Sequence, residues 1–409
     1  MCRGVARSAE SVIVGTMLRT LSHLKNLKGK RVLIRVDFNV PMKAGSVADD
    51  TRIRETLPTL KYLLKGKAHV IIMTHLGRPD GKVVPGLRLN PIATRLQKLL
   101  GKPVKKLNEC IGPAIEKEIS KMKDGSVVML ENVRFHEEEE ACDVGFSKDL
   151  AKLGDVYVND AFGTCHRAHS STAGVAKYLP SYAGFLVERE VKFLTPLLTK
   201  PKKPLTLIVG GAKVDTKIGI LKNFLGKANY ILIGGALANT FLAAEGFDMG
   251  TSLYEKDKLE IARDILLEAQ KKRIKVLMPV DAIVADEILE NATTLDLPLE
   301  DIEGNMKILD IGNITRLNYI SIIKKSKTVI WNGPLGLHEA KPFAGGSKAI
   351  AKALAASKAA TYLGGGDTID AINRFKISPK KFTFVSTGGG AMLKFMEGKK
   401  LPGIQALER

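Results

Sequence analysis

The sequence has few of the residues and motifs that mark several large classes of protein. Its four cysteines form neither a C-x-x-C pair nor a zinc-like spacing, which indicates a reducing compartment. Walker A and G-x-G-x-x-G strings are both absent, which argues against P-loop and dinucleotide-binding folds. No run of about 18 uncharged apolar residues is present, so the sequence predicts no membrane span. A single tryptophan among 6% aromatic residues provides no platform for stacking bases.

Composition places the chain among globular proteins with a strong positive charge. Hydrophobic residues make up 45% of the 409 positions, which excludes disorder and is enough for two or three domains of about 150 residues each. Lys and Arg number 63 against 43 Asp and Glu, a formal net charge of +20. This excess favours anionic partners such as phosphorylated metabolites, nucleic acid or membrane surfaces, and charge alone does not choose among them.

The first 16 residues differ from the rest of the chain. Arg3 and Arg7 precede an apolar run at 12–14 that is too short for the hydrophobic region of a secretory signal. We therefore predict a cytoplasmic protein. Met17 opens a more ordinary beginning, so residues 1–16 form an N-terminal extension that is a tail, a weak transit signal or the product of an upstream start.

Short β-rich apolar runs alternate with longer amphipathic stretches throughout the chain. This alternation is typical of β-α-β units, so the fold class is predicted to be α/β with parallel sheets. Between two such halves, 188–199 has a helical pattern and precedes the stiff, basic segment 201–204, which together form the predicted linker. The predicted strands are 31–36, 69–74, 126–130, 155–158, 205–209, 230–233, 275–278, 328–331, 360–363 and 382–386.

Polar and charged side chains follow the predicted strands of the first half. Ligands bind beyond the carboxyl ends of the strands in open α/β sheets, and Arg can grip a carboxylate or phosphate with two hydrogen bonds. This half therefore suits a small anion. Arg35 lies on the same strand face as Asp37, and a local ion pair between them is the alternative to a binding role. The strand-end candidates are Asp37, Asn39, His75, Arg78, Asn132, Arg134, Asn159 and Asp160, with further His and Arg side chains in the loop 166–171.

Glycines follow the strands of the second half, at 210–211, 234–235, 333, 364–366 and 388–390. Glycine lets backbone N–H groups approach phosphate oxygens, and a helix N-terminus adds a favourable dipole, so this half is predicted to bind a nucleotide. Lys213 and Lys217 would share one face of a helix that begins there, as phosphate ligands or as solvated lysines. Asp367 either holds Mg²⁺ with the phosphates or caps the next helix.

Other polar residues have structural interpretations. The acidic run 137–140 is expected to be a solvated loop or a helix start. No Ser-His-Asp order or metal triad emerges from the histidines. His23, His69, His136 and His338 are therefore expected to be structural or surface side chains.

Together these segments resemble one family, phosphoglycerate kinase, along nearly the whole chain from Met17. In the first half the similar strings are KRVLIRVDFNVP at 30–41, DDTRI at 49–53, HLGRP at 75–79, LENVRF at 130–135 and DAFG at 160–163. In the second half they are GGAKV at 210–214, WNGP at 331–334, GGGDT at 364–368 and STGGG at 386–390.

The resemblance implies a fold and a reaction. The fold is a pair of Rossmann-like parallel-sheet domains joined by a hinge helix, with a cleft between them, in a monomer. The reaction is the reversible transfer of the acyl phosphate of 1,3-bisphosphoglycerate to MgADP, giving 3-phosphoglycerate and MgATP in glycolysis. The implied parts are a phosphoglycerate-binding domain at 17–187, a hinge helix at 188–200, a nucleotide-binding domain at 201–390 and a C-terminal segment at 391–409 that returns to the first domain.

The resemblance also assigns roles to individual residues. The implied phosphoglycerate ligands are Arg35, Asp37, Asn39, Arg52, His75, Arg78, Arg134 and Arg167. The implied nucleotide ligands are Gly211, Ala212, Lys213, Lys217, Gly235, Asn332, Pro334, Glu339, Gly365, Gly366, Asp367 and Thr368, with Asp367 on the Mg²⁺. The residues implied to act on the transferring group are Arg52, Lys213, Lys217, Gly365 and Gly388. The chain departs from the family's usual residues at Asp215, Thr216, Ala236, His338 and Ser347.

Two other functions are alternatives to the kinase, and each predicts a different observation. A basic nucleic-acid or surface-binding protein on the same scaffold would bind DNA or RNA with an affinity that falls steeply with salt. A dinucleotide-dependent dehydrogenase would need bound NAD, and the sequence lacks its fingerprint. We predict small-molecule substrates, no specific nucleic acid and no membrane partner.

Overall fold

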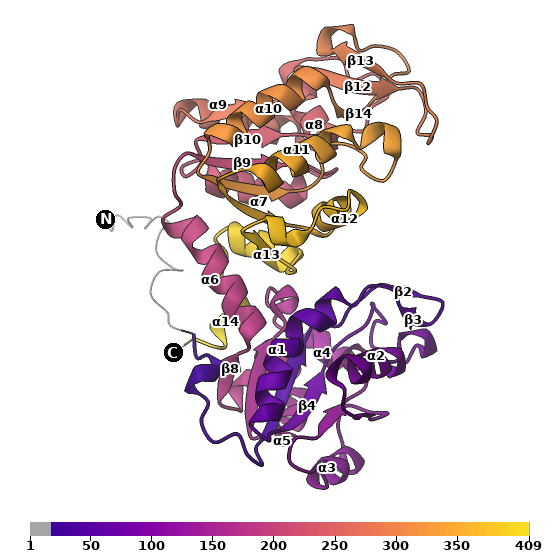
Figure 1. Cartoon of the computed structure of the whole chain (residues 1–409), viewed down its shortest axis with the longest axis vertical. Helices are drawn as coiled ribbons and strands as arrows, with labels where there is room; N and C mark the ends of the chain where they lie inside the picture. The colour runs from indigo at the N-terminus through magenta and orange to yellow at the C-terminus, as the bar shows by residue number, and fades with distance from the viewer. Residues whose placement is uncertain (1–17, 409) are drawn as a thin grey trace, which may run out of the picture. The chain divides into compact units, whose positions relative to one another are not determined.

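The computed structural model describes residues 18–408, which divide into two compact units. Unit 1 comprises the chain up to Thr195 together with the segment from Lys400, and unit 2 is Pro196–Lys399. Figure 1 labels many of the elements of each unit. The predictions about the N-terminal extension, 1–16, lie outside the described residues.

Unit 1 is built on a six-stranded parallel sheet. Its strand order is β5-β6-β4-β1-β7-β8, so β1 lies in the interior of the sheet. The central strands are runs of Val, Ile and Leu that are buried on both faces, as parallel strands between helices are. The strands are β1 Arg31–Val36, β4 His69–Met73, β5 Val104–Lys106, β6 Val127–Met129, β7 Val156–Asp160 and β8 Ser181–Ala183, and a small hairpin pairs β2 Met42–Lys43 with β3 Ser46–Val47.

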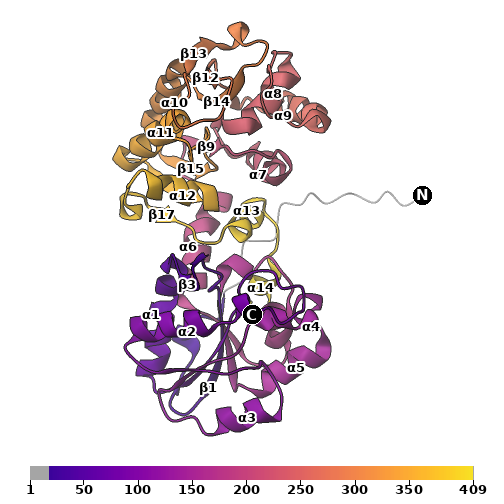
Figure 2. The same cartoon turned by 90° about the vertical axis from the view of Figure 1, so that its right-hand side faces the viewer.

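Helices cover both faces of this sheet. In Figure 2, α1 and α2 lie on one side of β1, and α4 and α5 lie on the other. The C-terminal segment from Lys400 also belongs to this unit, where the Gly403 N–H donates to the carbonyl of Cys165 at 2.9 Å, whereas 391–399 belongs to unit 2. The helices of the unit are α1 Thr51–Lys65, α2 Asn90–Leu100, α3 Pro113–Ser120, α4 Glu137–Ala141, α5 Val144–Lys152 and α14 Pro402–Gln405.

Unit 2 contains a second six-stranded parallel sheet and a smaller antiparallel one. The orders are β11-β10-β9-β15-β16-β17 and β13-β12-β14. The strands are β9 Leu205–Val209, β10 Tyr230–Ile233, β11 Lys275–Leu277, β12 Asp281–Ala285, β13 Leu295–Pro298, β14 Lys307–Ile311, β15 Thr328–Asn332, β16 Ala360–Gly364 and β17 Phe384–Val385.

Helices also lie on both faces of the larger unit 2 sheet. Figure 2 shows α10 and α11 on one side and α7, α8 and α9 on the other. The helices are α7 Asp215–Phe224, α8 Gly235–Glu245, α9 Leu259–Lys271, α10 Asn313–Lys325, α11 Gly345–Ala356, α12 Gly366–Arg374 and α13 Gly390–Met396. The predicted helix at 188–199 is confirmed as part of α6, Phe185–Thr199, which contains the boundary between the units.

The α/β class with parallel sheets is confirmed, and each of the ten predicted strands overlaps an observed one. The prediction missed β5, β8, the β2–β3 hairpin and the whole three-stranded antiparallel sheet. β5 and β8 have only three residues each, and β13 is mostly exposed, so none of the three has a long apolar run. Among residues 18–408, no helix has the length and apolar content that crossing a membrane requires.

Glycine turns pack backbone against backbone at the carboxyl edge of the unit 2 sheet. Gly211 and Gly235 have φ values of +98° and +65°, a region that favours glycine. The Gly211 N–H donates to the carbonyl of Pro334 at 2.8 Å, and the Gly210 N–H donates to that of Asn332 at 3.0 Å. A Cβ atom on Gly210 would lie 2.0 Å from the Pro334 oxygen, so this contact requires glycine.

We predict that Gly210→Ala lowers the free energy of unfolding of unit 2 by about 3 kcal/mol, because the added methyl group overlaps a backbone oxygen. Gly226→Ala is the matched control, since a Cβ there meets no atom within 4 Å, and its effect should stay within about 1 kcal/mol. The sole tryptophan, Trp331, is buried in β15, so its fluorescence reports denaturant unfolding of unit 2 alone. Equal stability of the two variants would contradict the proposed packing role.

Candidate functional site

The first candidate site lies at the carboxyl edge of the unit 1 sheet, around Arg35. This residue is near the end of β1, in register with Asn159 of β7, and its side chain is fully buried. Its Nε donates to Ser171 Oγ at 2.8 Å, and its Nη2 lies 3.1 Å from His75 Nδ1. Strand pairing therefore brings side chains from three distant parts of the sequence around one guanidinium group.

Asp37 pairs with Arg52 and not with its strand neighbour Arg35. Arg52 Nη1, in α1, lies 2.8 Å from Asp37 Oδ2 and donates to the Asn39 carbonyl at 3.3 Å. The Asn39 side-chain oxygen accepts a hydrogen bond from the Gly77 N–H at 2.9 Å. The Asp37 side chain is 9% exposed and that of Arg52 is 35% exposed, so part of the Arg52 guanidinium can still reach a ligand. The alternative of a local Arg35–Asp37 pair is wrong.

Arg134 and Arg167 add two further guanidinium groups to this edge. Arg134 Nη1 donates to the carbonyl of Gly77 at 2.8 Å. Arg134 Nε also pairs with Glu140 Oε1 at 3.0 Å. Burial lowers the pKa of Arg134, and the charges of Arg35 and Arg167 lower it further, although Glu140 opposes this shift. Arg78 is exposed and makes no side-chain hydrogen bond or ion pair within residues 18–408, so its predicted role depends on a ligand that it would reach from the loop.

Two buried histidines within this cluster are neutral. Burial, together with the charges of Arg35, Arg134 and Arg52, holds the pKa of His75 well below its usual value. Burial likewise lowers the pKa of His169 to about 3. Because a guanidinium has no acceptor, His75 Nδ1 accepts from Arg35, and the ring carries its proton on Nε2. His75 can therefore donate one hydrogen bond to an anion without taking up its proton.

Glu139 supports the cluster and was missed by the sequence analysis. The predicted helix start is confirmed, since α4 begins at Glu137, but the Glu139 side chain is fully buried, so the expectation of a solvated run is wrong at this position. Glu139 accepts hydrogen bonds from the Ser171 N–H at 2.8 Å and from Ser171 Oγ at 2.5 Å. The same Ser171 oxygen accepts from Arg35, so Glu139 fixes the guanidinium through one hydroxyl. The helical period is the signal that could have found this residue, because it places one glutamate of the run on the inner face of α4.

Three strand-end candidates serve the fold and not a ligand. Asn132 brackets the neighbouring loop, because its Oδ1 accepts from the Leu76 N–H at 3.3 Å and its Nδ2 donates to the Leu76 carbonyl at 2.8 Å. Asn159 Oδ1 accepts from the backbone two residues on. Asp160 accepts from the Leu186 N–H at 2.9 Å at the start of α6, and burial raises the pKa of this carboxyl to about 7.

The unit 1 site is thus a cationic cluster held by backbone carbonyls, hydroxyls and two buried carboxylates. Its guanidinium groups converge from β1, α1, η3 Val133–Phe135 and the loop that carries Arg167. Such planar donors match carboxylate and phosphate oxygens. The arrangement can bind a small, multiply charged anion.

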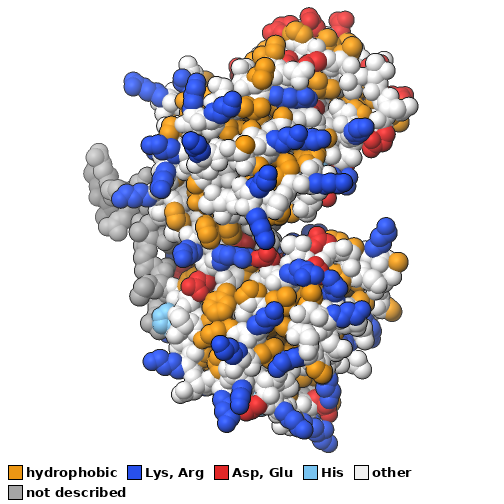
Figure 3. Space-filling view, in the orientation of Figure 1, with side chains coloured by type: hydrophobic (Ala, Val, Ile, Leu, Met, Phe, Trp, Pro, Cys, Tyr) orange, Lys and Arg blue, Asp and Glu red, His pale blue; other side chains and the backbone are white. Residues whose placement is uncertain are grey.

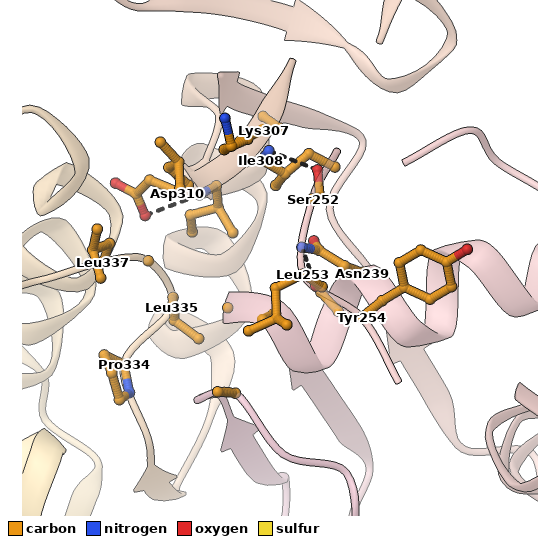
Figure 4. Close-up of a pocket in the computed structure, with 18 of the residues that line it drawn as sticks. Asn239, Ser252, Leu253, Tyr254, Lys307, Ile308, Asp310, Pro334, Leu335 and Leu337 are labelled. Atoms are coloured by element: carbon orange, nitrogen blue, oxygen red, sulfur yellow. Dashed lines mark hydrogen bonds between the residues drawn. The ribbon is translucent and has the colours of Figure 1, made fainter. Parts of the chain in front are cut away.

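The second candidate site is a cavity of about 600 Å³ in unit 2 (Figure 4). Its walls come from the turns after β9, β10 and β15, from α8, and from β12 and β14. Six residues predicted to bind the nucleotide line it, namely Gly211, Ala212, Gly235, Pro334, Glu339 and Asp367.

Most of the cavity wall is apolar, and the sequence analysis missed this part. Leu253 and Tyr254 follow α8, and Ile308 belongs to β14 (Figure 4). Two polar side chains brace the wall, since Ser252 Oγ accepts from the Ile308 N–H at 2.8 Å and Asn239 Nδ2 donates to the Leu253 carbonyl at 3.0 Å. No motif marks these residues, because they come together from α8, the segment after it and β14. An apolar pocket with few polar groups suits a flat organic ring.

Lys217 lies at the edge of this region in an unusual environment. It is in the first turns of α7 and largely buried, and its Nζ contacts Asn332 Oδ1. Burial lowers the pKa of Lys217 to about 8, although the nearby carboxylate of Asp367 opposes this shift. Asn332 Nδ2 in turn donates to the Gly364 carbonyl at 2.8 Å. This lysine is therefore pre-positioned and only weakly solvated.

Lys213 and Lys217 do not share a helix face as predicted. α7 begins at Asp215, so Lys213 lies in the turn before the helix with its side chain exposed. The turn forms because the Gly211 backbone is held by Pro334. The same segment therefore presents two different ammonium groups. That of Lys213 is solvated, and that of Lys217 is buried.

The glycines near the phosphate end have different local roles. The Gly211, Gly235 and Gly388 N–H groups donate to Pro334, Leu335 and Ser386 Oγ, so they are not available as phosphate donors, contrary to the prediction from glycine turns. Gly365, with φ +98°, is the residue before α12, and Gly366 opens that helix. Its first N–H groups have no intrahelical partner, as at any helix N-terminus.

Asp367 and Thr368 belong to the first turn of α12. Asp367 is exposed toward the cavity and is not the capping residue of the helix, so the capping alternative is wrong. Thr368 is buried, and its Oγ1 accepts from the Gly333 N–H at 2.7 Å. Asp367 thus lies near Lys217 while Thr368 fixes the turn after β15.

The positive charge of the chain forms no single patch on the faces visible in Figure 3. Lys and Arg side chains are dispersed over each unit among apolar and neutral ones. A nucleic-acid-binding surface would instead gather them along one face or groove. The visible faces therefore give no support to the nucleic-acid alternative.

Comparisons with known proteins agree on one family. The family model described as phosphoglycerate kinase matches residues 21–399. A phosphoglycerate kinase of Dictyoglomus turgidum is 51% identical over 385 residues, which cover 94% of this chain and 97% of that protein. One from Pelotomaculum thermopropionicum is 49% identical over 382 residues, covering 93% and 97%.

Solved structures of the same family share the fold. The structure of phosphoglycerate kinase from Coxiella burnetii matches with a TM-score of 0.86 at 40% identity, covering 96% of this chain and 99% of that one. The crystal structure from Pyrococcus horikoshii matches with a TM-score of 0.84 at 35% identity, covering 96% and 98%. The chain therefore belongs to the phosphoglycerate kinase family and is a phosphotransferase with a carboxyl acceptor, which moves the acyl phosphate of 1,3-bisphosphoglycerate to ADP in glycolysis.

Proposed function

We propose that unit 1 binds the phosphoglycerate and unit 2 the nucleotide, as the domains 17–187 and 201–390 of the sequence prediction. The observation that carries this proposal is the contrast between the two sites. Guanidinium groups converge at the sheet edge of unit 1, whereas unit 2 offers an apolar cavity beside the ammonium of Lys217. A multiply charged sugar acid suits the first environment, and a base with phosphates suits the second.

In unit 1 the ligand has two ends that need different partners. Asp37 and Asn39 hold the hydroxyl and carboxyl end, where Arg52 also approaches. His75 donates from Nε2, and Arg35 orients its ring. The groups assigned to the 3-phosphate end are His75, Arg78, Arg134 and Arg167.

In unit 2 the phosphate chain runs from the cavity toward α12. Gly211, Ala212, Gly235, Pro334 and Glu339 surround the nucleoside. The groups assigned to the phosphates are Lys213, Lys217, Asn332, Gly365, Gly366, Asp367 and Thr368, with Gly388 near the transferring group. The open N-terminus of α12 favours phosphate oxygens through its unpaired N–H groups.

The reaction needs charge stabilisation more than proton transfer. The nucleophile, a carboxylate or an ADP oxygen, is already ionised, so no general base is required. The phosphoryl group carries charge on three equatorial oxygens in the transition state. We assign the stabilisation of that charge to Arg52, Lys213 and Lys217. Each is a cation with N–H groups that can donate to phosphate oxygens.

Mg²⁺ fits the residues at the phosphate end. Asp367 presents an exposed carboxylate to the cavity, and a single carboxylate with substrate phosphates is a usual ligand set for this ion. When bound, Mg²⁺ neutralises phosphate charge. The carboxylate of Asp367 also favours the charged form of Lys217, so the same residue interacts with both cations.

The two ligand sets belong to different units, so transfer requires the units to close during turnover. Closure would also exclude water from a labile acyl phosphate. The hinge is the segment 188–200, which α6 contains almost entirely. We further propose that the enzyme is monomeric and cytoplasmic, as the sequence analysis predicts.

Arg52→Ala should lower kcat by about 10² to 10³-fold, because the variant loses a cation that acts on the transition state. Arg54→Ala is the matched control, since Arg54 is on the same helix but pairs with Asp50 on an exposed face. Steady-state assays with 3-phosphoglycerate and MgATP measure both variants, and circular dichroism checks their folding. Wild-type turnover of Arg52→Ala would remove this residue from the mechanism.

Lys217 should give the nucleotide reaction a pH dependence. Its ammonium is charged below a pKa of about 8, so kcat/KM for MgATP should fall as the pH rises through that value. Lys217→Met should abolish this fall and lower kcat/KM at pH 7. Lys222→Met, on the exposed side of α7, should keep the wild-type profile. A pH profile unchanged in Lys217→Met would refute the assignment.

Glu139 should act as a positioning residue for Arg35. Glu139→Gln weakens the hold on Ser171, so KM for 3-phosphoglycerate should rise about tenfold. KM for MgATP should stay unchanged, because that site is in unit 2. Glu138→Gln, an exposed neighbour, is the control. If both substrates were affected equally in Glu139→Gln, a general loss of folding would explain the result better.

A further inference from the structure

Three metal-ligating side chains converge in unit 1 on residues to which the reaction assigns no role. Within residues 18–408, Glu109, Cys110 and His136 are the one group of three or more His, Cys, Asp or Glu residues whose ligand atoms all lie within 4.8 Å of one another. Glu109 and Cys110 are in the loop after β5, and His136 directly follows η3 at the end of β6. The group therefore lies beyond the carboxyl ends of two adjacent parallel strands, where open α/β sheets bind ligands.

The three side chains are already oriented toward one another. Glu109 Oε1 lies 2.7 Å from His136 Nε2 and accepts from the Cys110 N–H at 2.9 Å. The His136 ring packs against Phe146 with centroids 4.8 Å apart, which fixes its plane. Cys110 Sγ donates to the Glu131 carbonyl at 3.1 Å. One strong contact thus joins the carboxylate and imidazole, and the thiol lies beneath them.

The three side chains differ in exposure, in an order that gives an ion a route into the site. Cys110 is fully buried, the His136 side chain is 21% exposed and that of Glu109 is 53% exposed. An ion can reach the thiol from the side of the two more exposed ligands. Glu109, on a loop with an exposed side chain, can move aside during entry and close over the ion afterwards.

The donor set and spacing match a known class of metal ion. Thiolate, imidazole and carboxylate together favour Zn²⁺ and related thiophilic ions over Mg²⁺ or Ca²⁺, which prefer oxygen alone. Tetrahedral Zn²⁺ with ordinary bond lengths needs ligand atoms about 3.4–3.6 Å apart. The present separations are all within 4.8 Å, and Glu109 Oε1 lies 2.7 Å from His136 Nε2, so binding requires the ligand atoms to shift by about 1 Å.

A bound ion would displace the thiol proton of Cys110 and the proton shared between Glu109 and His136, because metal ligands bind in their deprotonated forms.

We propose that Glu109, Cys110 and His136 form a site for one thiophilic divalent cation of the Zn²⁺ type, with water as the fourth ligand. The ion ties the loop after β5 to the segment after η3. Since η3 carries Arg134 of the phosphoglycerate cluster, the ion also stabilises the backbone that positions this arginine. The site is separate from the Mg²⁺ proposed for Asp367 in unit 2.

Cobalt titration of the chelator-treated, full-length protein without nucleotide tests the proposal, because Co²⁺ substitutes for Zn²⁺ and reports a thiolate ligand directly. We expect one equivalent of Co²⁺ to produce a thiolate-to-metal charge-transfer band and the strong visible bands of four-coordinate Co²⁺. One equivalent of Zn²⁺ should remove both sets of bands. No charge-transfer band with Co²⁺ in molar excess would overturn the proposal.

Variants separate this site from other cysteines. Cys110→Ser should abolish the charge-transfer band, whereas Cys142→Ser, at another free thiol, should keep it. His136→Gln retains the thiol and should weaken Co²⁺ binding at least about tenfold, by loss of a ligand. Circular dichroism establishes that each variant is folded. A band that survives in Cys110→Ser, or an affinity unchanged in His136→Gln, would show that the ion binds elsewhere.

Discussion

Parallel strands end at one edge of their sheet, and both sites of this enzyme depend on that constraint. In unit 1 the ends of β1, β4 and β7 bring Arg35, His75 and the segment after Asn159 together although they are far apart in the sequence. In unit 2 the turns after β9, β10 and β15 meet at the corresponding edge. The same topology therefore forms a cationic site in unit 1 and an apolar cavity in unit 2, because different residues follow the strands of the two sheets.

The two edges solve different physical problems. Unit 1 holds several guanidinium groups close together, and fixed acceptors stabilise three of them. Asp37 accepts from Arg52, and the Gly77 carbonyl accepts from Arg134. Ser171, which is held by the buried carboxylate of Glu139, accepts from Arg35, and nearby histidines remain neutral. The residual positive charge is then available to an anionic substrate, and the donors are in place before it binds.

Unit 2 places its turns in close backbone contact instead. Gly210 and Gly235 allow neighbouring turns to approach to distances that a side chain would block, and their N–H groups are used within the protein. This packing leaves Lys217 with little water around it, which lowers its pKa into the range where its charge responds to pH. A lysine in this state loses little further hydration when it binds phosphate. Little of its electrostatic attraction to the ligand is therefore offset by the cost of desolvation.

The sequence by itself determined the α/β class, the ten strand segments and the family, because apolar runs and contiguous motifs are local features. It also marked Arg35, Arg52 and Asp367, whose residue types are tied to phosphate and metal chemistry. Only the tertiary structure decided that Asp37 pairs with Arg52, that Glu139 is buried behind Ser171, and that residues near Ser252 and Ile308 wall the cavity. These outcomes depend on burial and on pairing between distant segments, and no local pattern encodes either one.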